Sequence, residues 1–152
     1  MKYFSLKAAS YIANVCDANN IHYSNSIKIQ KLLYCCYGCV LAVHNERLCD
    51  EYPRAWQYGP VFPKVFSYIS KGKDLLPICP VLDAPVGVLD LIYDAIKAFG
   101  RYSASALSAW TYATGSPWDF VVNGMNERNG IIPDDLIAEY FRAHVIRESG
   151  DE

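Results

Sequence analysis

Hydrophobic residues recur along most of the chain at intervals of three and four, the spacing that predicts helices with one buried face. After Ser5, which can cap a helix, this spacing is carried by Ala9, Ile12, Ala13 and Cys16 and ends at Asn19-Asn20. After the polar segment Ser24-Asn25-Ser26 it is carried by Ile29, Leu32, Leu33, Cys36, Val40 and Val43. The first third of the chain is therefore predicted to form two helices.

The second of these helices is apolar on almost every side, because Tyr34, Tyr37 and Leu41 occupy its other face. A helix of this kind belongs in the middle of a fold, with neighbours on several sides. We expect Lys28 and Lys31 to mark its one edge in contact with water. The apolar run from Leu32 to Val43 has twelve residues, fewer than the ~18 that suggest a membrane span.

The pattern changes between Leu48 and Gly72. Asp50-Glu51-Tyr52-Pro53 has the composition of a turn, and Arg54 to Tyr58 alternates with a period of two, which together predict a small hairpin. Gly59-Pro60 should then break the strand. A third helix is predicted from Phe62, Val65, Phe66 and Ile69, with Gly72 at its end. Residues 73 to 85 hold three prolines and should form a surface connection.

Four more helices are predicted in the remainder. One opens at Asp83 or before Pro85, carries Leu89, Ile92, Ile96 and Phe99, and should stop at a left-handed Gly100. Ser103 caps the next, Ser116-Pro117-Trp118-Asp119 starts a short one, and Pro133-Asp134-Asp135 starts the last, with Arg142 and Arg147 towards its C-terminal end. We expect residues 1–152 to form one mainly α domain, a compact bundle of about seven helices with one small β-hairpin.

Composition and charge narrow the classes of function. Hydrophobic residues make up 52% of the chain and charged residues 20%, so a folded core is expected. The net charge of -2, without a cluster of Lys or Arg, disfavours direct binding to nucleic acid. Lys7 interrupts what would be the apolar part of an export signal, so we expect a cytoplasmic protein with no membrane partner and with its six cysteines reduced.

Cys36, Cys39, His44 and Cys49 have the spacing of a zinc knuckle that binds single-stranded nucleic acid. On a helix, however, Cys36 and His44 are separated by a rise of about 12 Å, too far to share one tetrahedral zinc ion. Zinc would require the helix to end near Cys35. Reduced thiols in a core helix are the favoured interpretation, with no metal and no cofactor, and the zinc-binding module is the alternative of another class.

Catalytic signatures are weak. His22, His44 and His144 lack the surroundings of a general base beside a nucleophile, and the nine glycines form no phosphate-binding loop. We therefore expect the chain not to be an enzyme, with thiol or hydrolytic chemistry as the remaining alternative.

Trp56-Gln57-Tyr58-Gly59-Pro60-Val61-Phe62 is the candidate for binding, because a rigid turn that presents aromatic side chains suits the centre of a protein interface. The competing and stronger interpretation is a structural corner packed on the core. An arrangement in which one side chain is buried while its neighbour is exposed stays open as well.

Four segments in order give the chain a resemblance to a known family. They are Lys28-Ile29-Gln30-Lys31-Leu32-Leu33-Tyr34, then Ala55-Trp56-Gln57-Tyr58-Gly59-Pro60-Val61, then Tyr102-Ser103-Ala104 with Leu107-Ser108 and Thr111 leading to Pro117-Trp118, and finally Ile132 to Phe141. Together, over about residues 25–141, they resemble the Panacea (SocA-like) antitoxin-associated domain. Tyr112 stands where that family typically has a histidine, so a role for that histidine is not expected here.

The resemblance implies an antitoxin or adaptor that neutralises a cognate toxin by direct contact, or that delivers the toxin to a protease, without a cofactor. It also implies a place on a prophage or other mobile element, and a phage-borne inhibitor of a host defence protein is the close alternative. The predicted partner surface comprises Trp56, Tyr58, Gly59, Pro60 and Phe62, together with Lys28 and Lys31.

Overall fold

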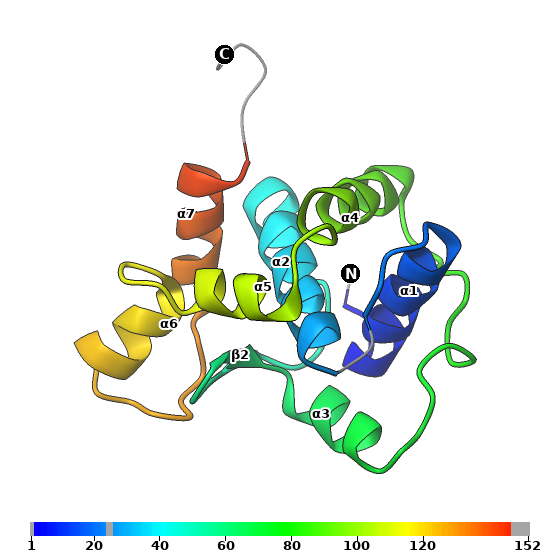
Figure 1. Ribbon diagram of the computed structural model, residues 1–152. Coiled ribbons are helices and arrows are strands. Elements are labelled where there is room, and N and C mark those ends of the chain that lie inside the picture. Colours follow the sequence, from blue (N-terminus) through cyan, green and yellow to red (C-terminus); the bar gives the residue numbers. More distant parts are fainter. Residues whose placement is uncertain (1, 24–25, 147–152) are drawn as a thin grey trace.

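The computed structural model describes residues 2–23 and 26–146 (Figure 1). Within them the chain forms seven α-helices, one two-stranded hairpin and one π-helical turn, in agreement with the predicted mainly α fold. In chain order the elements are α1 (Ser5–Ala18), α2 (Ser26–His44), β1 (Arg54–Trp56), β2 (Gly59–Val61), α3 (Pro63–Ser70), α4 (Val86–Phe99), α5 (Ala104–Thr111), α6 (Pro117–Asp119), η1 (Phe120–Gly124) and α7 (Asp134–His144).

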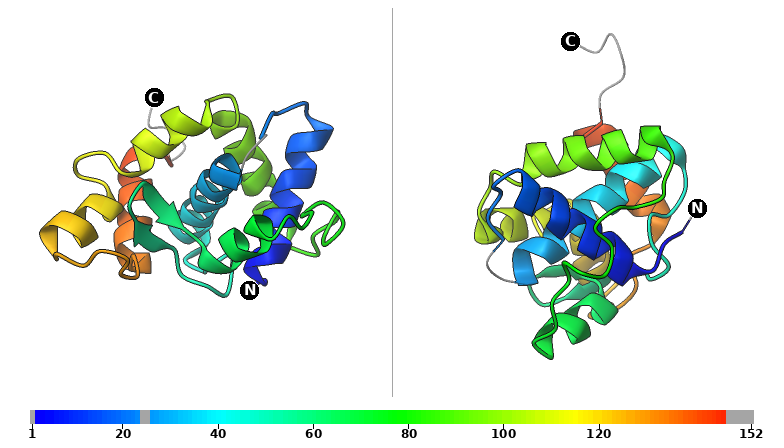
Figure 2. Two further views of the ribbon diagram at one scale, coloured as in Figure 1. Left: turned by 60° about the horizontal axis from the view of Figure 1, so that its bottom comes forward. Right: turned by 90° about the vertical axis from the view of Figure 1, so that its right-hand side faces the viewer.

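The helix α2 is the centre of the molecule. It packs against α1, α3, α4, α5, α7 and strand β2, and Figures 1 and 2 show the other helices arranged around it. A helix that is apolar on almost every side was predicted to lie in the middle of the fold, and Leu32, Leu33 and Val40 are fully buried there. The predicted wet edge is wrong: Lys28 is 8% exposed and Lys31 only 2%, because the helix is covered on this side as well.

The helix starts agree with the sequence in two places and differ in one. Ser103 Oγ accepts from the N–H of Ala106, and Ser116 Oγ accepts from the N–H of Asp119, as predicted. Ser5 is not a cap, because it is the first residue of α1 and its N–H donates to Asp50 Oδ1 at 3.1 Å. The predicted start at Ser24-Asn25 lies outside the described residues.

Of two predicted helix ends, one needs revision and one agrees with the sequence. Gly100 follows α4 with φ of −65°, so it is not left-handed, and a side chain there would meet Ile21 and the backbone of Ile96 instead. Arg142 Nε, in the last turn of α7, donates to the carbonyl of Ala42 near the end of α2. Arg147 lies outside the described residues.

The hairpin differs from its prediction because Gly59-Pro60 belongs to strand β2 and does not break it. The antiparallel register pairs Arg54 with Val61, Ala55 with Pro60 and Trp56 with Gly59. Pro60 has no N–H to donate to its partner. Ala55 is satisfied from the other side, since its N–H donates to Gly130 O and its carbonyl accepts from Asn129 N. A proline is therefore tolerated opposite it.

In the described part of the chain, no helix is both long and apolar enough to span a lipid bilayer.

Candidate partner-binding groove

The central helix holds the hairpin through two adjacent polar side chains. Gln30 Oε1 accepts from Phe62 N at 2.8 Å, and Gln30 Nε2 donates to Phe62 O at 3.1 Å. Both backbone groups are buried, so each needs a partner. Gln30 thereby fixes the point at which the hairpin leads into α3.

Lys31 makes the next contact. Its ammonium donates to the carbonyl of Pro60 at 2.8 Å, and burial lowers the pKa of Lys31 to about 8. Gly59, with φ of +112°, leaves the space for this side chain, because an added Cβ would approach Lys31 Nζ and Thr111 Oγ1. The glycine is thus required both by its backbone conformation and by the close approach of α2 and α5.

The helix α5 and the Pro117-Trp118 segment hold the same hairpin from its other sides. Ser108 Oγ donates to Tyr58 O at 3.0 Å, and Trp118 Nε1 donates to Trp56 O at 2.6 Å. Three separate segments of the chain therefore converge on residues 56–62. The family resemblance rests on these same segments. Their polar side chains recur in it because they hold the backbone of the hairpin.

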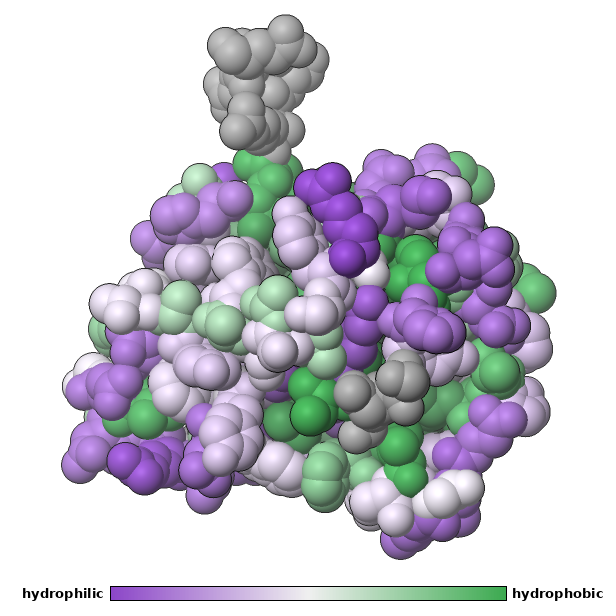
Figure 3. All heavy atoms as spheres, in the orientation of Figure 1, coloured by the Kyte–Doolittle hydropathy of each residue, from purple (hydrophilic) through white to green (hydrophobic). Residues whose placement is uncertain are grey.

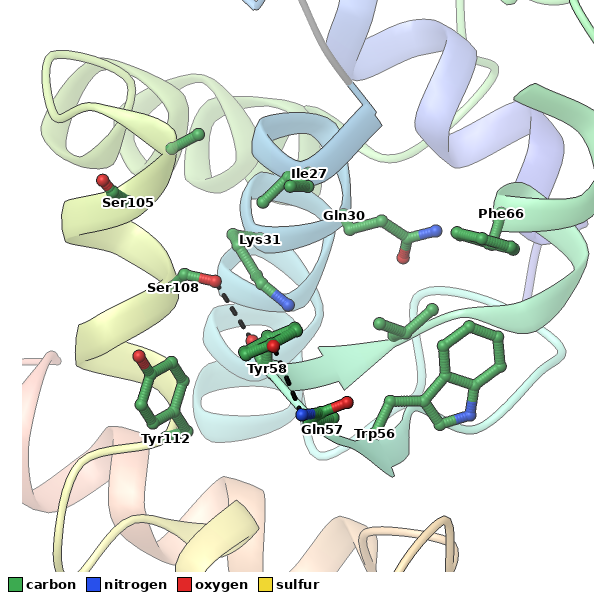
Figure 4. A pocket seen from close by; sticks show the side chains of 12 residues that line it. Ile27, Gln30, Lys31, Trp56, Gln57, Tyr58, Phe66, Ser105, Ser108 and Tyr112 are labelled. Carbon is green, nitrogen blue, oxygen red and sulfur yellow. Dashed lines mark hydrogen bonds between the residues drawn. The ribbon is translucent and has the colours of Figure 1, made fainter. Parts of the chain in front are cut away.

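A groove of about 670 Å³ opens where these elements meet (Figure 4). Its lining residues are Ile27, Gln30 and Lys31 from α2, Trp56, Gln57, Tyr58 and Val61 from the hairpin, Phe66 from α3, and Ala104, Ser105, Ser108 and Tyr112 from α5 and its end. Figure 3 shows that the face over α5 is made mostly of residues of intermediate hydropathy. The groove is mainly apolar with a few polar groups, the composition expected of a binding site.

The structure separates the predicted partner-binding residues into two groups. Tyr58 is 67% exposed, and Trp56 is half-buried with its ring against that of Phe66. Phe62 is 0% exposed and packs on Tyr37, so its expected place on the surface is wrong. Gly59 and Pro60 are buried in the hairpin.

The two lysines also differ from each other. Lys31 lines the groove, whereas Lys28 is buried outside the groove lining. Residues 56–62 thus combine the two interpretations that the sequence suggested. One side of this corner is packed on the core, and the other side is an aromatic surface.

Sequence reasoning missed seven residues of the groove, namely Ile27, Gln30, Phe66, Ala104, Ser105, Ser108 and Tyr112. Phe66 was assigned only to a helix stripe, although it is partly exposed beside Trp56. The available signal was the apolar circumference of α2: a helix surrounded by neighbours must also place its polar side chains against them. Lys31 could have been assigned to the interior on that ground.

The cysteine and histidine set does not converge. α2 is continuous to His44, past Cys35, so the condition that a zinc site would require is not met. No group of three or more possible ligands lies together among residues 2–23 and 26–146. Cys36, Cys39 and Cys49 are buried thiols, and burial raises the pKa of Cys39 to about 12 and that of Cys36 well above its usual range.

Fold and groove together define a small, mainly helical domain whose prominent surface feature is an apolar cleft around a Gly-Pro hairpin. The chain is 31% identical to the antitoxin SocA of Caulobacter vibrioides (strain NA1000 / CB15N) over 151 residues, which cover 88% of this chain and 80% of that protein. It belongs to the SocA-like antitoxin family. No protein-family model and no solved structure matches it.

Proposed function

We propose that this chain is an antitoxin that neutralises a cognate toxin by direct contact, and that the groove between the hairpin, α2, α3 and α5 receives the toxin. The observation that carries the proposal is the aromatic character of the groove. Tyr58, Phe66 and Tyr112 are partly or largely exposed and line the same groove as Trp56, although exposed aromatics are costly unless a partner covers them.

The rigidity of the groove supports this role. The backbone of residues 56–62 is held by side chains of Gln30, Lys31, Ser108 and Trp118, so Tyr58 is presented from a fixed turn. A partner that binds such a surface loses little conformational entropy on the antitoxin side. The role needs neither a catalytic group nor a cofactor.

Co-expression with the product of the reading frame adjacent to this gene, taken as the candidate toxin, tests the proposal. We expect wild-type chain to restore growth and to copurify with the toxin, and Tyr58→Ala to weaken both because the largest exposed anchor is lost. Tyr93→Ala, which removes a partly exposed tyrosine on α4 outside the groove lining, is the matched control and should retain both. Equal loss in the two variants would count against the groove.

The amount of toxin distinguishes the two modes of neutralisation. Direct contact leaves the toxin level unchanged while growth recovers. Delivery to a protease lowers the toxin level, and a protease-deficient host then loses the rescue.

A further inference from the structure

The groove is asymmetric in charge. Among its lining residues Lys31 is charged and positive, and none is an Asp or Glu. An apolar cleft with a cation and without an anion is complementary to a ligand that combines an apolar side chain with a negative group.

The charge of Lys31 is not neutralised within the described chain. Lys31 as a residue is 2% exposed, its ammonium donates to a carbonyl, the O of Pro60, and no described carboxylate lies within ion-pair distance of it. Burial without a counter-charge disfavours the ammonium, and the lowered pKa of Lys31 follows from the same cause. An anion that enters the groove therefore meets an uncompensated positive charge in a medium of low polarity, where its attraction is strong.

Two helices also begin at the groove. Ile27 lies in the first turn of α2, and Ala104 and Ser105 form the first turn of α5, and neither turn contains an acidic residue. Ser103 caps the N–H of Ala106, whereas the N–H groups of Ala104 and Ser105 have no hydrogen-bond partner among the described residues. Free N–H groups at a helix start carry partial positive charge, which adds to that of Lys31.

We propose that the groove binds a segment of the toxin in which a carboxylate stands next to an apolar side chain. The apolar side chain packs against Tyr58 and Phe66, and the carboxylate lies between Lys31 and the start of α5. This inference rests on the proposed function, because it names the chemistry of the partner at the same groove.

Two neighbouring positions of α5 provide a matched pair of variants. Ser105 is exposed and lines the groove, whereas Ala106 is exposed and does not. Asp at either position adds the same charge to the first turn of the helix and should stabilise it. Only Ser105→Asp places that charge where an acidic ligand would bind, so loss of binding cannot be attributed to unfolding.

The probe is a random dodecapeptide library displayed on phage and selected on the full chain. We expect the selected peptides to be enriched in Asp or Glu beside an aromatic or aliphatic residue. For such a peptide, the amide analogue should bind about tenfold more weakly than the acid. Ser105→Asp should weaken binding of the acid about threefold or more, and Ala106→Asp should leave it unchanged.

The ratio of the dissociation constants of the amide and acid peptides measures the contribution of Lys31 to the preference for an acid. We expect the preference for acid over amide to decrease strongly in Lys31→Met, where only the start of α5 remains, and to persist in Lys97→Met, which removes an exposed lysine of α4. A ratio measured within one variant does not depend on how stable that variant is. Selection of basic or purely apolar peptides, no enrichment, or an unchanged ratio in Lys31→Met overturns the inference.

Failure here is distinguishable from failure of the proposed function. If Tyr58→Ala abolishes toxin binding while the library shows no acidic preference, the groove is the toxin site and the inference about its ligand is wrong. If the library yields acidic peptides but no toxin is neutralised, the groove is acid-selective and the proposed function is wrong.

Discussion

Two tyrosines on α2 differ in what their hydroxyl groups contact. Tyr37 donates to Asp134 Oδ1, and Asp134 is also paired with Arg47 at 3.4 Å. Tyr34 is equally buried, but its hydroxyl has no hydrogen-bond partner among the described residues. A buried polar group without a partner loses its hydration without gaining a hydrogen bond, which destabilises the folded state.

Tyr34→Phe is therefore expected to leave the free energy of unfolding unchanged or to raise it by up to about 1 kcal/mol. Tyr37→Phe, the matched control, should lower it by about 1–3 kcal/mol because it removes a hydrogen bond to a charged acceptor. Urea unfolding measures both. A large loss of stability in Tyr34→Phe would mean that its hydroxyl is hydrogen-bonded in solution.

Lys31 predicts a specific dependence of stability on pH. Its pKa is about 8 in the folded chain and near 10.5 ordinarily. Between these values the unfolded chain holds a proton that the folded chain has released, so the contribution of Lys31 to stability rises as pH rises from about 8 to 10.5. The buried thiols act in the opposite direction above pH 9, since burial raises the pKa of Cys16 to about 11.

Comparison with Lys31→Met separates these effects, because the thiols titrate in both proteins. We expect the stability of wild type relative to Lys31→Met to increase between pH 7.5 and 10, as measured by chemical denaturation at each pH. A constant difference would contradict a buried, uncompensated ammonium.

At the scale of elements, α2 and α7 approach closely at Gly38. A Cβ added at Gly38 would enter the ring of Phe141, which is fully buried against Tyr34 and Trp110. Glycine is unfavourable in a helix, and here close packing with the neighbouring helix accounts for it.

Gly38→Ala should accordingly lower the free energy of unfolding by about 1–3 kcal/mol despite the better helix propensity of alanine. Gly87→Ala in α4 is the control, because the nearest atom to its added Cβ is 3.8 Å away, on His44. That variant should gain about 0.5–1 kcal/mol. Thermal melting of the two proteins would refute the account of Gly38 if both were stabilised.

Helices were the elements that the sequence predicted best, because each signal was local. Ser103 and Ser116 cap their helices through side chains three residues from their partners, and the stripe of α4 needs no knowledge of its neighbours. The hairpin was placed correctly but Gly59-Pro60 was not. Pro60 can lie in β2 because the N–H of Ala55 donates to the carbonyl of Gly130. Local sequence patterns do not contain this contact, which joins positions 75 residues apart.

In the candidate site, too, the residues with a local signal were predicted and those that depend on contacts between elements were not. Trp56 and Tyr58 were found because aromatic residues at a turn are a local signal. The burial of Lys31 and Phe62 and the contribution of Ser105 depend on how α2, α3 and α5 pack, so periodicity alone assigned them wrongly or missed them.

Considered as a whole, the molecule uses its central helix to hold a binding corner. The polar residues of α2 fix the hairpin, α5 and Trp118 support it from other sides, and the aromatic groove opens at their junction. The segments on which the family resemblance rests thus largely hold the hairpin, while under the proposed function the exposed groove residues determine which toxin is bound.

The central claim is that the toxin occupies this groove, and hydrogen–deuterium exchange of the antitoxin alone and in complex with the copurified toxin tests it most directly. We predict that binding slows exchange in residues 56–61 and 104–112 and leaves α4 unchanged. Slower exchange confined to α4 or α1, with the groove segments unaffected, would contradict it.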